Sequence, residues 1–227
     1  MQHSGIRQPV TPEGAKVQGA KVVLQPRPGH EPEGNQAKRQ KAGRLRYIFI
    51  TSCGWKQLGV KYGSWGNSWP TLSEAVQSKI TLKGGGLHDL IFDCRMFKEP
   101  LDDTYYCTGE NYKTIDSVVN NAHFVSELGR IKAAIYELED SGKTEHAKVA
   151  FVCCGGNHRG PAMARIVQSC LDRTGYLLGH PNHMSRWVWP KKGKCTTCNV
   201  CTDEQAKEAL LLKAFKIWNT LPDSRIN

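Results

Sequence analysis

The chain has 227 residues, of which 39% are hydrophobic and 23% charged, and its formal net charge is +10. This length and balance suit a soluble domain of ordinary size with additional segments. The sequence also excludes a membrane span, because no apolar run approaches the length that a bilayer requires. The first residues also lack the apolar block of a secretory signal, so we expect a cytoplasmic protein whose nine cysteines are reduced thiols.

The first 46 residues differ in composition from the rest. They hold nine Lys or Arg against three Glu, a net charge of +6, so the remaining residues carry only +4 of the total +10. They also hold six Gly, five Pro and no Phe or Trp. Such a segment buries too little apolar surface to offset the entropy of ordering. We therefore predict that residues 1–46 form a disordered basic arm, either a solvated tail or a contact for RNA or acidic membranes.

Ordered structure is expected from residue 47 onward. Residues 47–52 are β-branched and aromatic, which predicts a first strand. After a loop rich in Gly and Trp, the sequence predicts a helix at 71–80, a break at the glycine run 84–86 and a second strand at 89–93. Apolar residues then recur every three or four positions, which predicts one long helix over residues 116–140.

The second half of the chain continues the alternation. A third strand at 148–152 enters a glycine-rich turn, a helix over 161–173 follows, and 176–178 is a candidate fourth strand. Residues 180–201 have no regular pattern. A last helix is predicted at 202–219, with Thr202 and Gln205 spaced as a capping box.

Strands that alternate with helices predict an α/β fold with a largely parallel sheet flanked by helices, over residues 47–221. Ligands of such sheets bind beyond the carboxyl ends of the strands. Three loops are expected to converge there: 53–56, 93–98 and 153–159. The sequence therefore predicts a pocket at that edge of the sheet.

The most informative loop follows the third strand. Residues 153–160 read Cys-Cys-Gly-Gly-Asn-His-Arg-Gly, and Pro161 opens the helix behind them. Glycines let backbone amides approach an anion, the helix start leaves amides unpaired, and Arg159 adds a planar cation. A tight turn without a ligand is the alternative, which the glycine pair alone would fit. The sequence favours a phosphate-binding turn made of Cys154, Gly155, Gly156, Asn157, His158, Arg159 and Gly160.

Side chains on the two neighbouring loops are further candidate ligand groups. Arg95 would meet anionic oxygens, and Asp93 would accept from hydroxyls or an amine; alternatively, the two form a structural pair. Lys56 is an additional cation after the first strand, unless it is simply solvated. His158 either donates to the anion or orients Arg159, or it is a buried structural histidine.

A catalytic alternative uses the same turn. Five residues separate Cys153 from Arg159, which is the spacing of the phosphate loop in cysteine-dependent phosphatases. In such an enzyme the Cys153 thiolate would attack the phosphoryl group and Asp93 would be the general acid. Those enzymes usually carry His before the Cys and Ser or Thr after the Arg, where this chain has Val152 and Gly160. We therefore expect a binding domain without catalysis of its own.

Residues 180–201 form a separate insertion rich in Cys, Trp and Lys. Cys195, Cys198 and Cys201 have the two-residue spacing that lets thiolates share one metal ion. His180 or His183 could complete a tetrahedral zinc site. The alternatives are an iron–sulfur cluster on the same sulfurs and a loop with three reduced cysteines.

The same insertion is basic. It has no acidic residue, and Trp187 and Trp189 lie among its cations. Cations mixed with indoles suit an RNA backbone and stacked bases, whereas the alternative is that both tryptophans pack on the body of the domain. The candidate RNA-binding residues are Arg186, Lys191, Lys192 and Lys194.

Three motifs resemble the RapZ C-terminal domain family. Residues 153–159 resemble its Cys-Thr-Gly-Gly-x-His-Arg-Ser signature, and residues 92–100 (Phe-Asp-Cys-Arg-Met-Phe-Lys-Glu-Pro) resemble its Phe-Asp-Val-Arg-Phe-Leu-Pro-Asn-Pro run. Residues 52–56 (Ser-Cys-Gly-Trp-Lys) are similar to its Ser-Phe-Gly-Phe-Lys-Tyr-Gly strand end. Residues 60–63 (Val-Lys-Tyr-Gly) are a second match to that motif, and we prefer the first because it directly follows a strand. The motifs occur in the family's order over about residues 47–190.

The resemblance implies a domain that binds an amino-sugar phosphate and RNA, as in RapZ proteins, which are bacterial RNA-binding adaptors. This chain has no Gly-x-x-x-x-Gly-Lys-Ser/Thr sequence, so we do not expect the P-loop nucleotide-binding module of RapZ. It departs from the family at Cys154, at Gly160 and at residues 99–101, where Glu-Pro-Leu replaces Asn-Pro-His.

We therefore expect this chain to bind a phosphorylated small molecule, either a sugar phosphate or a nucleotide, with RNA as a further partner. The two alternatives are a cysteine-dependent phosphatase and an RNA-binding module whose glycine turn contacts a backbone phosphate.

Overall fold

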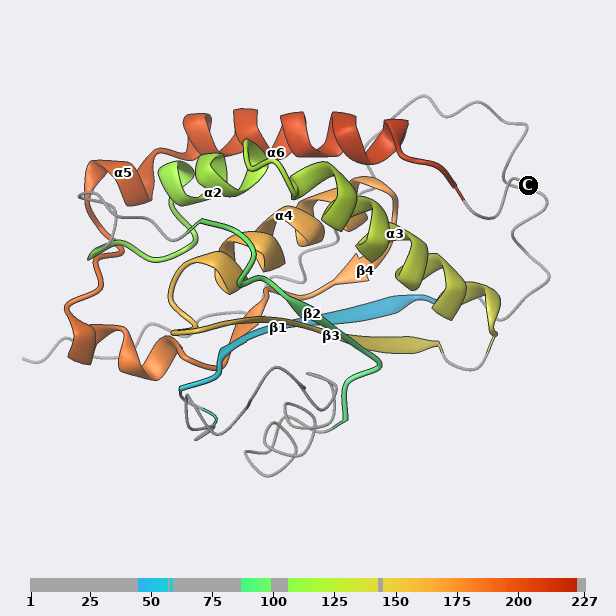
Figure 1. Cartoon of the computed structure of the whole chain (residues 1–227), viewed down its shortest axis with the longest axis horizontal. Helices are drawn as coiled ribbons and strands as arrows, with labels where there is room; N and C mark the ends of the chain where they lie inside the picture. The colour runs from blue at the N-terminus through green and yellow to red at the C-terminus, as the bar shows by residue number, and fades with distance from the viewer. Residues whose placement is uncertain (1–44, 57, 59–86, 99–105, 143–144, 224–227) are drawn as a thin grey trace, which may run out of the picture. The chain divides into compact units, whose positions relative to one another are not determined.

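A parallel β-sheet with helices on one face makes up the described part of the chain in the computed structural model (Figure 1). The structure describes residues 45–56, 58, 87–98, 106–142 and 145–223. Nearly all of the predicted arm at 1–46 lies outside these residues, as do the predicted helix at 71–80 and the glycine run 84–86. In the described segments, no helix combines the length and apolarity that crossing a bilayer requires.

The sheet has two long central strands with shorter strands beside them. β3 lies between β2 and β1, and β4 and β5 both pair with β1. Every pairing among the described strands is parallel, which confirms the predicted α/β class with a largely parallel sheet. The strands are β1 (Tyr47–Gly54), β2 (Leu90–Asp93), β3 (His146–Cys153), β4 (Leu177–Leu178) and β5 (Asn182–His183).

Because the strands are parallel, their carboxyl ends lie at one edge of the sheet. The register places Gly54 of β1 opposite Cys153 of β3, and Asp93 of β2 opposite Val152. Backbone bonds continue past the strand ends: the Trp55 amide donates to the Cys153 carbonyl at 3.0 Å, and the Cys94 amide donates to the Val152 carbonyl at 2.7 Å. The loops that follow β1, β2 and β3 therefore begin side by side, as the sequence predicts.

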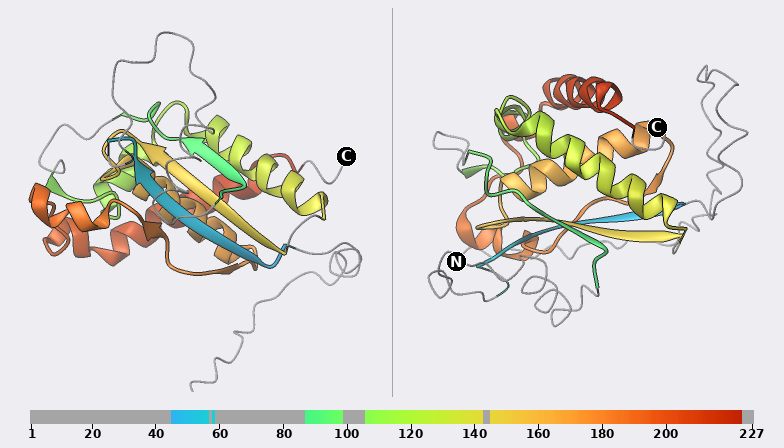
Figure 2. Two further views of the ribbon diagram at one scale, coloured as in Figure 1. Left: turned by 90° about the horizontal axis from the view of Figure 1, so that it is seen from below. Right: turned by 45° about the vertical axis from the view of Figure 1, so that its right-hand side comes forward.

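The longer described helices cover one face of the sheet, and the core lies between the two layers (Figure 2). α4 packs directly on β1 and β3, and α6 packs on α4 and α2. Along α4, small and aliphatic residues are buried for most of its length, because it lies between the sheet and the outer helix. These helices are α2 (Tyr112–Val119), α3 (Phe124–Asp140), α4 (Arg159–Arg173) and α6 (Glu204–Thr220).

The single helix predicted over 116–140 is wrong, because two helices occupy that stretch. α2 ends before Asn120, whose backbone amide bonds to the carbonyls of the preceding turn. The Asn121 side chain then accepts from the His123 amide at 3.0 Å. Asparagine side chains compete with the backbone for hydrogen bonds and so favour turns over helix interiors. The apolar periodicity continues across the break, which is why it indicated one helix.

The last helix also begins differently from the prediction. Asp203 is its N-cap, with Oδ1 accepting from the Ala206 amide at 2.9 Å. Thr202 instead ends the short helix α5 (Asn199–Thr202), and its hydroxyl donates to the Cys198 carbonyl at 3.1 Å. The predicted capping box of Thr202 and Gln205 is therefore wrong by one residue. The insertion before α5 contains β5 and two 3-10 turns, η3 (Arg186–Val188) and η4 (Pro190–Lys192).

Candidate functional site

The turn between β3 and α4 is tightly packed around Gly156. This residue has a φ of +66°, a left-handed conformation that glycine adopts without steric strain. A Cβ atom there would lie 2.1 Å from Ser185 Oγ and 2.7 Å from the Gly54 amide nitrogen. Both the backbone conformation and the close contact with β1 and the insertion therefore require glycine at this position.

The turn presents backbone donors at the start of a helix. In the part of the chain that the structure describes, the amides of Gly155, Gly156, Asn157 and Gly160 have no hydrogen-bond acceptor. Helix starts favour anions because their free amides and the helix dipole both present positive charge. The turn therefore offers backbone donors of the kind that an anion-binding site uses, and anion binding there stays a prediction.

Two buried oxygen atoms next to the turn also lack partners. Asn157 Oδ1 and Ser185 Oγ make no hydrogen bond to any described residue. Native proteins satisfy nearly all buried polar groups, so this unsatisfied pair calls for an explanation, and a bound ligand is one such explanation. Ser185 is not found by the sequence analysis, because no local motif connects it to a turn almost thirty positions away.

Arg159 lies beneath the turn, and only 7% of its surface is exposed. Its Nη1 donates to the carbonyls of Arg95 at 2.9 Å and Phe97 at 3.0 Å. The side chain therefore connects the first residue of α4 to the loop that follows β2. Its guanidinium is a buried positive charge at the helix start.

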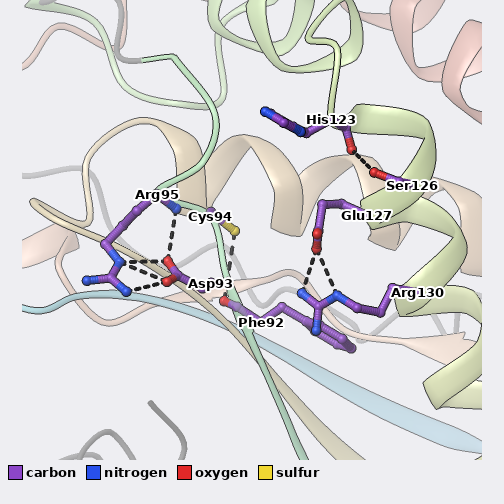
Figure 3. Close-up of polar contacts among 8 residues, drawn as sticks. All are labelled: Phe92, Asp93, Cys94, Arg95, His123, Ser126, Glu127 and Arg130. Carbon is purple, nitrogen blue, oxygen red and sulfur yellow. Dashed lines mark hydrogen bonds and ion pairs between the residues drawn. The ribbon is translucent and has the colours of Figure 1, made fainter. Parts of the chain in front are cut away.

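Asp93 and Arg95 bind each other in this structure (Figure 3). Arg95 Nε lies 2.8 and 2.9 Å from the two oxygens of Asp93, and Nη2 bonds to the same carboxylate. The Arg95 guanidinium also lies over the Trp55 ring, 5.3 Å from its centroid. Both side chains keep partial exposure, 19% for Arg95 and 25% for Asp93, so the pair borders the edge where the three loops meet.

The exposed Lys56 lies at the same edge, and its amide donates to the Cys154 carbonyl at 3.2 Å. On the far side of β2, Arg130 of α3 bonds to Glu127 and lies over the Phe92 ring at 5.1 Å (Figure 3). These contacts fix the end of β2 against α3.

The insertion folds back onto the turn. His158 is buried, and its Nε2 lies 3.1 Å from Lys194 Nζ. Trp189 is also buried, and its indole Nε1 donates to the Gly156 carbonyl at 3.3 Å. Trp189 therefore packs on the body of the domain, which was the alternative to a contact with RNA.

Trp187 behaves differently. Its side chain is 60% exposed, and Lys191 Nζ lies 5.3 Å from its ring centroid. Arg186 and Lys191 are exposed as well, whereas the side chain of Lys192 lies outside the described residues. One indole and its neighbouring cations thus face solvent.

His183 belongs to a polar chain that the sequence analysis missed. Its Nδ1 lies 2.7 Å from Ser52 Oγ, and its Nε2 lies 3.2 Å from Glu110 Oε1. The hydrogen bond to His183 lowers the pKa of Glu110 below its usual 4.5, against an opposing effect of burial. Neither His183 nor His180 joins the cysteines of the insertion, so the histidine expected to complete a zinc site is a wrong prediction.

The cysteines of the insertion meet a fourth cysteine from elsewhere in the chain. The sulfurs of Cys198, Cys201 and Cys107 all lie within 4.8 Å of one another. Cys195 is adjacent, because the Cys198 amide donates to its sulfur at 3.3 Å.

Cys153 is part of the hydrophobic core and only 2% exposed. Its neighbours include the thiols of Cys53 and Cys94, whose pKa values are raised by burial first and by Cys153 second, that of Cys53 to about 12. A nucleophilic thiolate needs an accessible, electropositive site. These surroundings argue against the cysteine-dependent phosphatase.

Comparison with known proteins agrees with the motifs. The family model described as the RapZ C-terminal domain matches residues 80–184. This span includes the loop after β2 and the whole turn at the start of α4, and it confirms the resemblance expected from the sequence. No curated protein matches the chain.

Proposed function

Starting from the match of residues 80–184 to the RapZ C-terminal domain, we propose that this chain binds a phosphorylated small molecule, a sugar phosphate or a nucleotide. The phosphate would lie at the turn between β3 and α4. The observation that carries the proposal is the set of four amides, from Gly155, Gly156, Asn157 and Gly160, without acceptors among the described residues. Converging amides at a helix start bind phosphate oxygens in many unrelated proteins.

Charged side chains around the turn suit an anionic ligand. Arg159 supplies a buried positive charge behind the amides, and Lys194 brings a second cation to His158. Lys56 is exposed beside Cys154 and is free of the packing that constrains the other two. We assign these groups to the phosphate. At the edge of the site, Asp93 would then accept from hydroxyls or an amine of the remaining ligand, and Arg95 would meet anionic oxygens.

We propose binding rather than catalysis. The thiol that would attack a phosphoryl group, Cys153, lies in the core, where a substrate has no access. The chain should therefore fail to hydrolyse p-nitrophenyl phosphate. Hydrolysis that disappears in Cys153→Ser would contradict a purely binding role.

Native mass spectrometry of the full chain, followed by calorimetric titration, tests the binding proposal. The titrants are glucosamine 6-phosphate, ATP and unphosphorylated glucosamine. We expect a phosphorylated titrant to bind, and glucosamine to show no measurable heat. The variant Lys56→Met should weaken binding by about tenfold, the equivalent of one lost charge-assisted hydrogen bond.

The matched control for Lys56→Met is Lys113→Met, an exposed lysine on α2 outside the site. It should leave the affinity unchanged. Equal weakening by both variants would indicate a general charge effect, and no binding of any phosphorylated titrant would reject the proposal.

RNA is a second candidate partner, favoured by the exposed Trp187 with Lys191 against its ring. An exposed indole beside cations can stack a base while the cations meet the backbone. Retention of a single-stranded RNA should fall as salt rises, and it should fall further in Trp187→Ala. RNA retention should be unchanged in Lys56→Met, because that variant alters the glycine turn and leaves the Trp187 surface intact. Retention unaffected by Trp187→Ala would reject this surface.

A further inference from the structure

Three cysteine sulfurs gather where the loop before α2 meets the insertion. Cys107 precedes α2, Cys198 is the residue before α5, and Cys201 lies within α5. Their sulfurs lie within 4.8 Å of one another, and those of Cys107 and Cys198 are 3.7 Å apart although 91 positions separate them in sequence. All nine cysteines are free thiols, and a disulfide would need about 2.05 Å between sulfurs. The cluster is therefore not a disulfide.

Cys195 is held beside this group by backbone contacts. Its amide donates to the Tyr106 carbonyl at 2.6 Å, and it forms a parallel bridge with Cys107. Its sulfur accepts from the Cys198 amide at 3.3 Å. An amide directed at a cysteine sulfur stabilises negative charge on that sulfur, as the outer contacts of metal-bound thiolates do. Cys195 is thus oriented as a fourth ligand.

We propose that Cys107, Cys195, Cys198 and Cys201 bind one Zn²⁺ ion as a closed tetrahedral site. Zinc–sulfur bonds of about 2.3 Å place the sulfurs of a tetrahedron about 3.8 Å apart. The distance between Cys107 and Cys198 matches that edge, and the separations among Cys107, Cys198 and Cys201, up to 4.8 Å, need only a small contraction. The sulfur of Cys195 lies outside this group of three and would have to move closer to complete the tetrahedron. An iron–sulfur cluster fits less well, because its core of iron and sulfide holds the cysteine sulfurs further apart than a single ion does.

Four protein ligands leave no open position on the ion, which is typical of a structural site rather than a catalytic one. The contacts of the two ligand-bearing segments indicate what the ion would stabilise. Beside Cys107, the Gly109 amide donates to the Asn157 carbonyl at 2.7 Å, and a Cβ on Gly109 would lie 1.9 Å from the His158 carbonyl oxygen. Beside Cys195, Lys194 reaches His158. The zinc ion would therefore connect the segment around Cys107 to the segment around Cys195, and both segments contact the glycine turn.

The test uses the full chain, expressed with zinc and purified under reducing conditions. Elemental analysis should find one zinc per chain, and X-ray absorption at the zinc edge should show four sulfur neighbours at about 2.3 Å. Cys107→Ser should lose at least about 90% of the zinc to a competing chelator under conditions where the wild type keeps it, as expected when a metal ligand is removed.

Two variants separate loss of a ligand from loss of the fold. Cys170→Ala changes a buried cysteine near the C-terminal end of α4 and should keep one zinc. Cys107→His keeps a metal-binding side chain at the same position and should retain more zinc than Cys107→Ser. Circular dichroism of each variant checks that the helices remain.

Several results would overturn the proposal. A wild-type chain without metal would do so, with or without disulfides among these cysteines. So would bound iron with acid-labile sulfide, or a zinc with only three sulfur neighbours that Cys107→Ser leaves unchanged. None of these results bears on phosphate binding at the turn, which the calorimetric titration measures separately.

Discussion

Lys194 Nζ lies 3.1 Å from His158 Nε2, so a cation from the insertion contacts the residue that immediately precedes α4. His158 is buried, and its ring nitrogen lies within hydrogen-bond distance of the ammonium group. The contact joins two segments that are 36 positions apart in sequence and brings positive charge to the glycine turn. It is the basis of the first prediction.

Lys194→Met should weaken the binding of a phosphorylated ligand by about tenfold, because it removes a cation from the turn and a contact that positions His158. Lys191→Met is the matched control, since that lysine lies over Trp187 instead. Calorimetric titration with the phosphorylated ligand measures both. A control that weakens binding as much as Lys194→Met would place the phosphate nearer to the exposed surface.

Gly156→Ala should destabilise the fold by about 2 kcal/mol or more, because a non-glycine residue is strained at positive φ and its Cβ would clash with Ser185. Gly175→Ala serves as the comparison. That glycine also has positive φ, of 89°, but nothing lies within 4 Å of its added Cβ. Urea denaturation should therefore show a larger loss for Gly156→Ala. Equal losses would mean that backbone strain alone matters.

Arg159→Ala should lower the free energy of unfolding by about 2–4 kcal/mol, since it leaves the buried carbonyls of Arg95 and Phe97 without this donor. Arg130→Ala, which removes a partly exposed ion pair with Glu127 and the contact with the Phe92 ring, should cost less, about 1 kcal/mol. Hydrogen exchange near residues 94–98 should rise in Arg159→Ala. Unchanged exchange there would show that other contacts hold the loop.

The contact between Glu110 and His183 predicts a pH dependence of stability. The pKa of Glu110 is lowered in the folded state, so the carboxylate stabilises the fold above its usual pKa of 4.5 and loses this effect as pH falls through the lowered value. Arg165 and Arg186 also favour the charged form. Glu110→Gln should therefore be less stable than the wild type at neutral pH.

Chemical denaturation of the wild type and Glu110→Gln at a series of pH values measures this difference. The gap between the two proteins should narrow once the pH falls below about 4.5. A gap that stays constant across the series would show that the charge of Glu110 makes no contribution, and that only its size or polarity matters.

Local patterns in the sequence were sufficient to predict the strands and the glycine turn between β3 and α4. The runs at β1 and β3 are mainly apolar, and the last five residues of each strand are buried throughout, as in a parallel sheet covered on both faces. The turn follows from glycines placed between a strand and a helix, a signal contained in eight consecutive residues. The sequence did not predict where α2 ends and α3 begins. Apolar spacing continues through Ala122, whereas only the hydrogen bonds of Asn120 and Asn121 reveal the break.

Contacts between distant segments were decided only by the tertiary structure. The spacing of Cys195, Cys198 and Cys201 indicated three thiolates in one place, but Cys107 meets them because the loop before α2 runs beside the insertion. In the same way, Ser185 reaches the turn through the path of the chain after β5. A periodic or spaced pattern records which residues share a local element. Which elements then lie against one another depends on how the whole chain buries its apolar surface, and no short stretch of sequence carries that information.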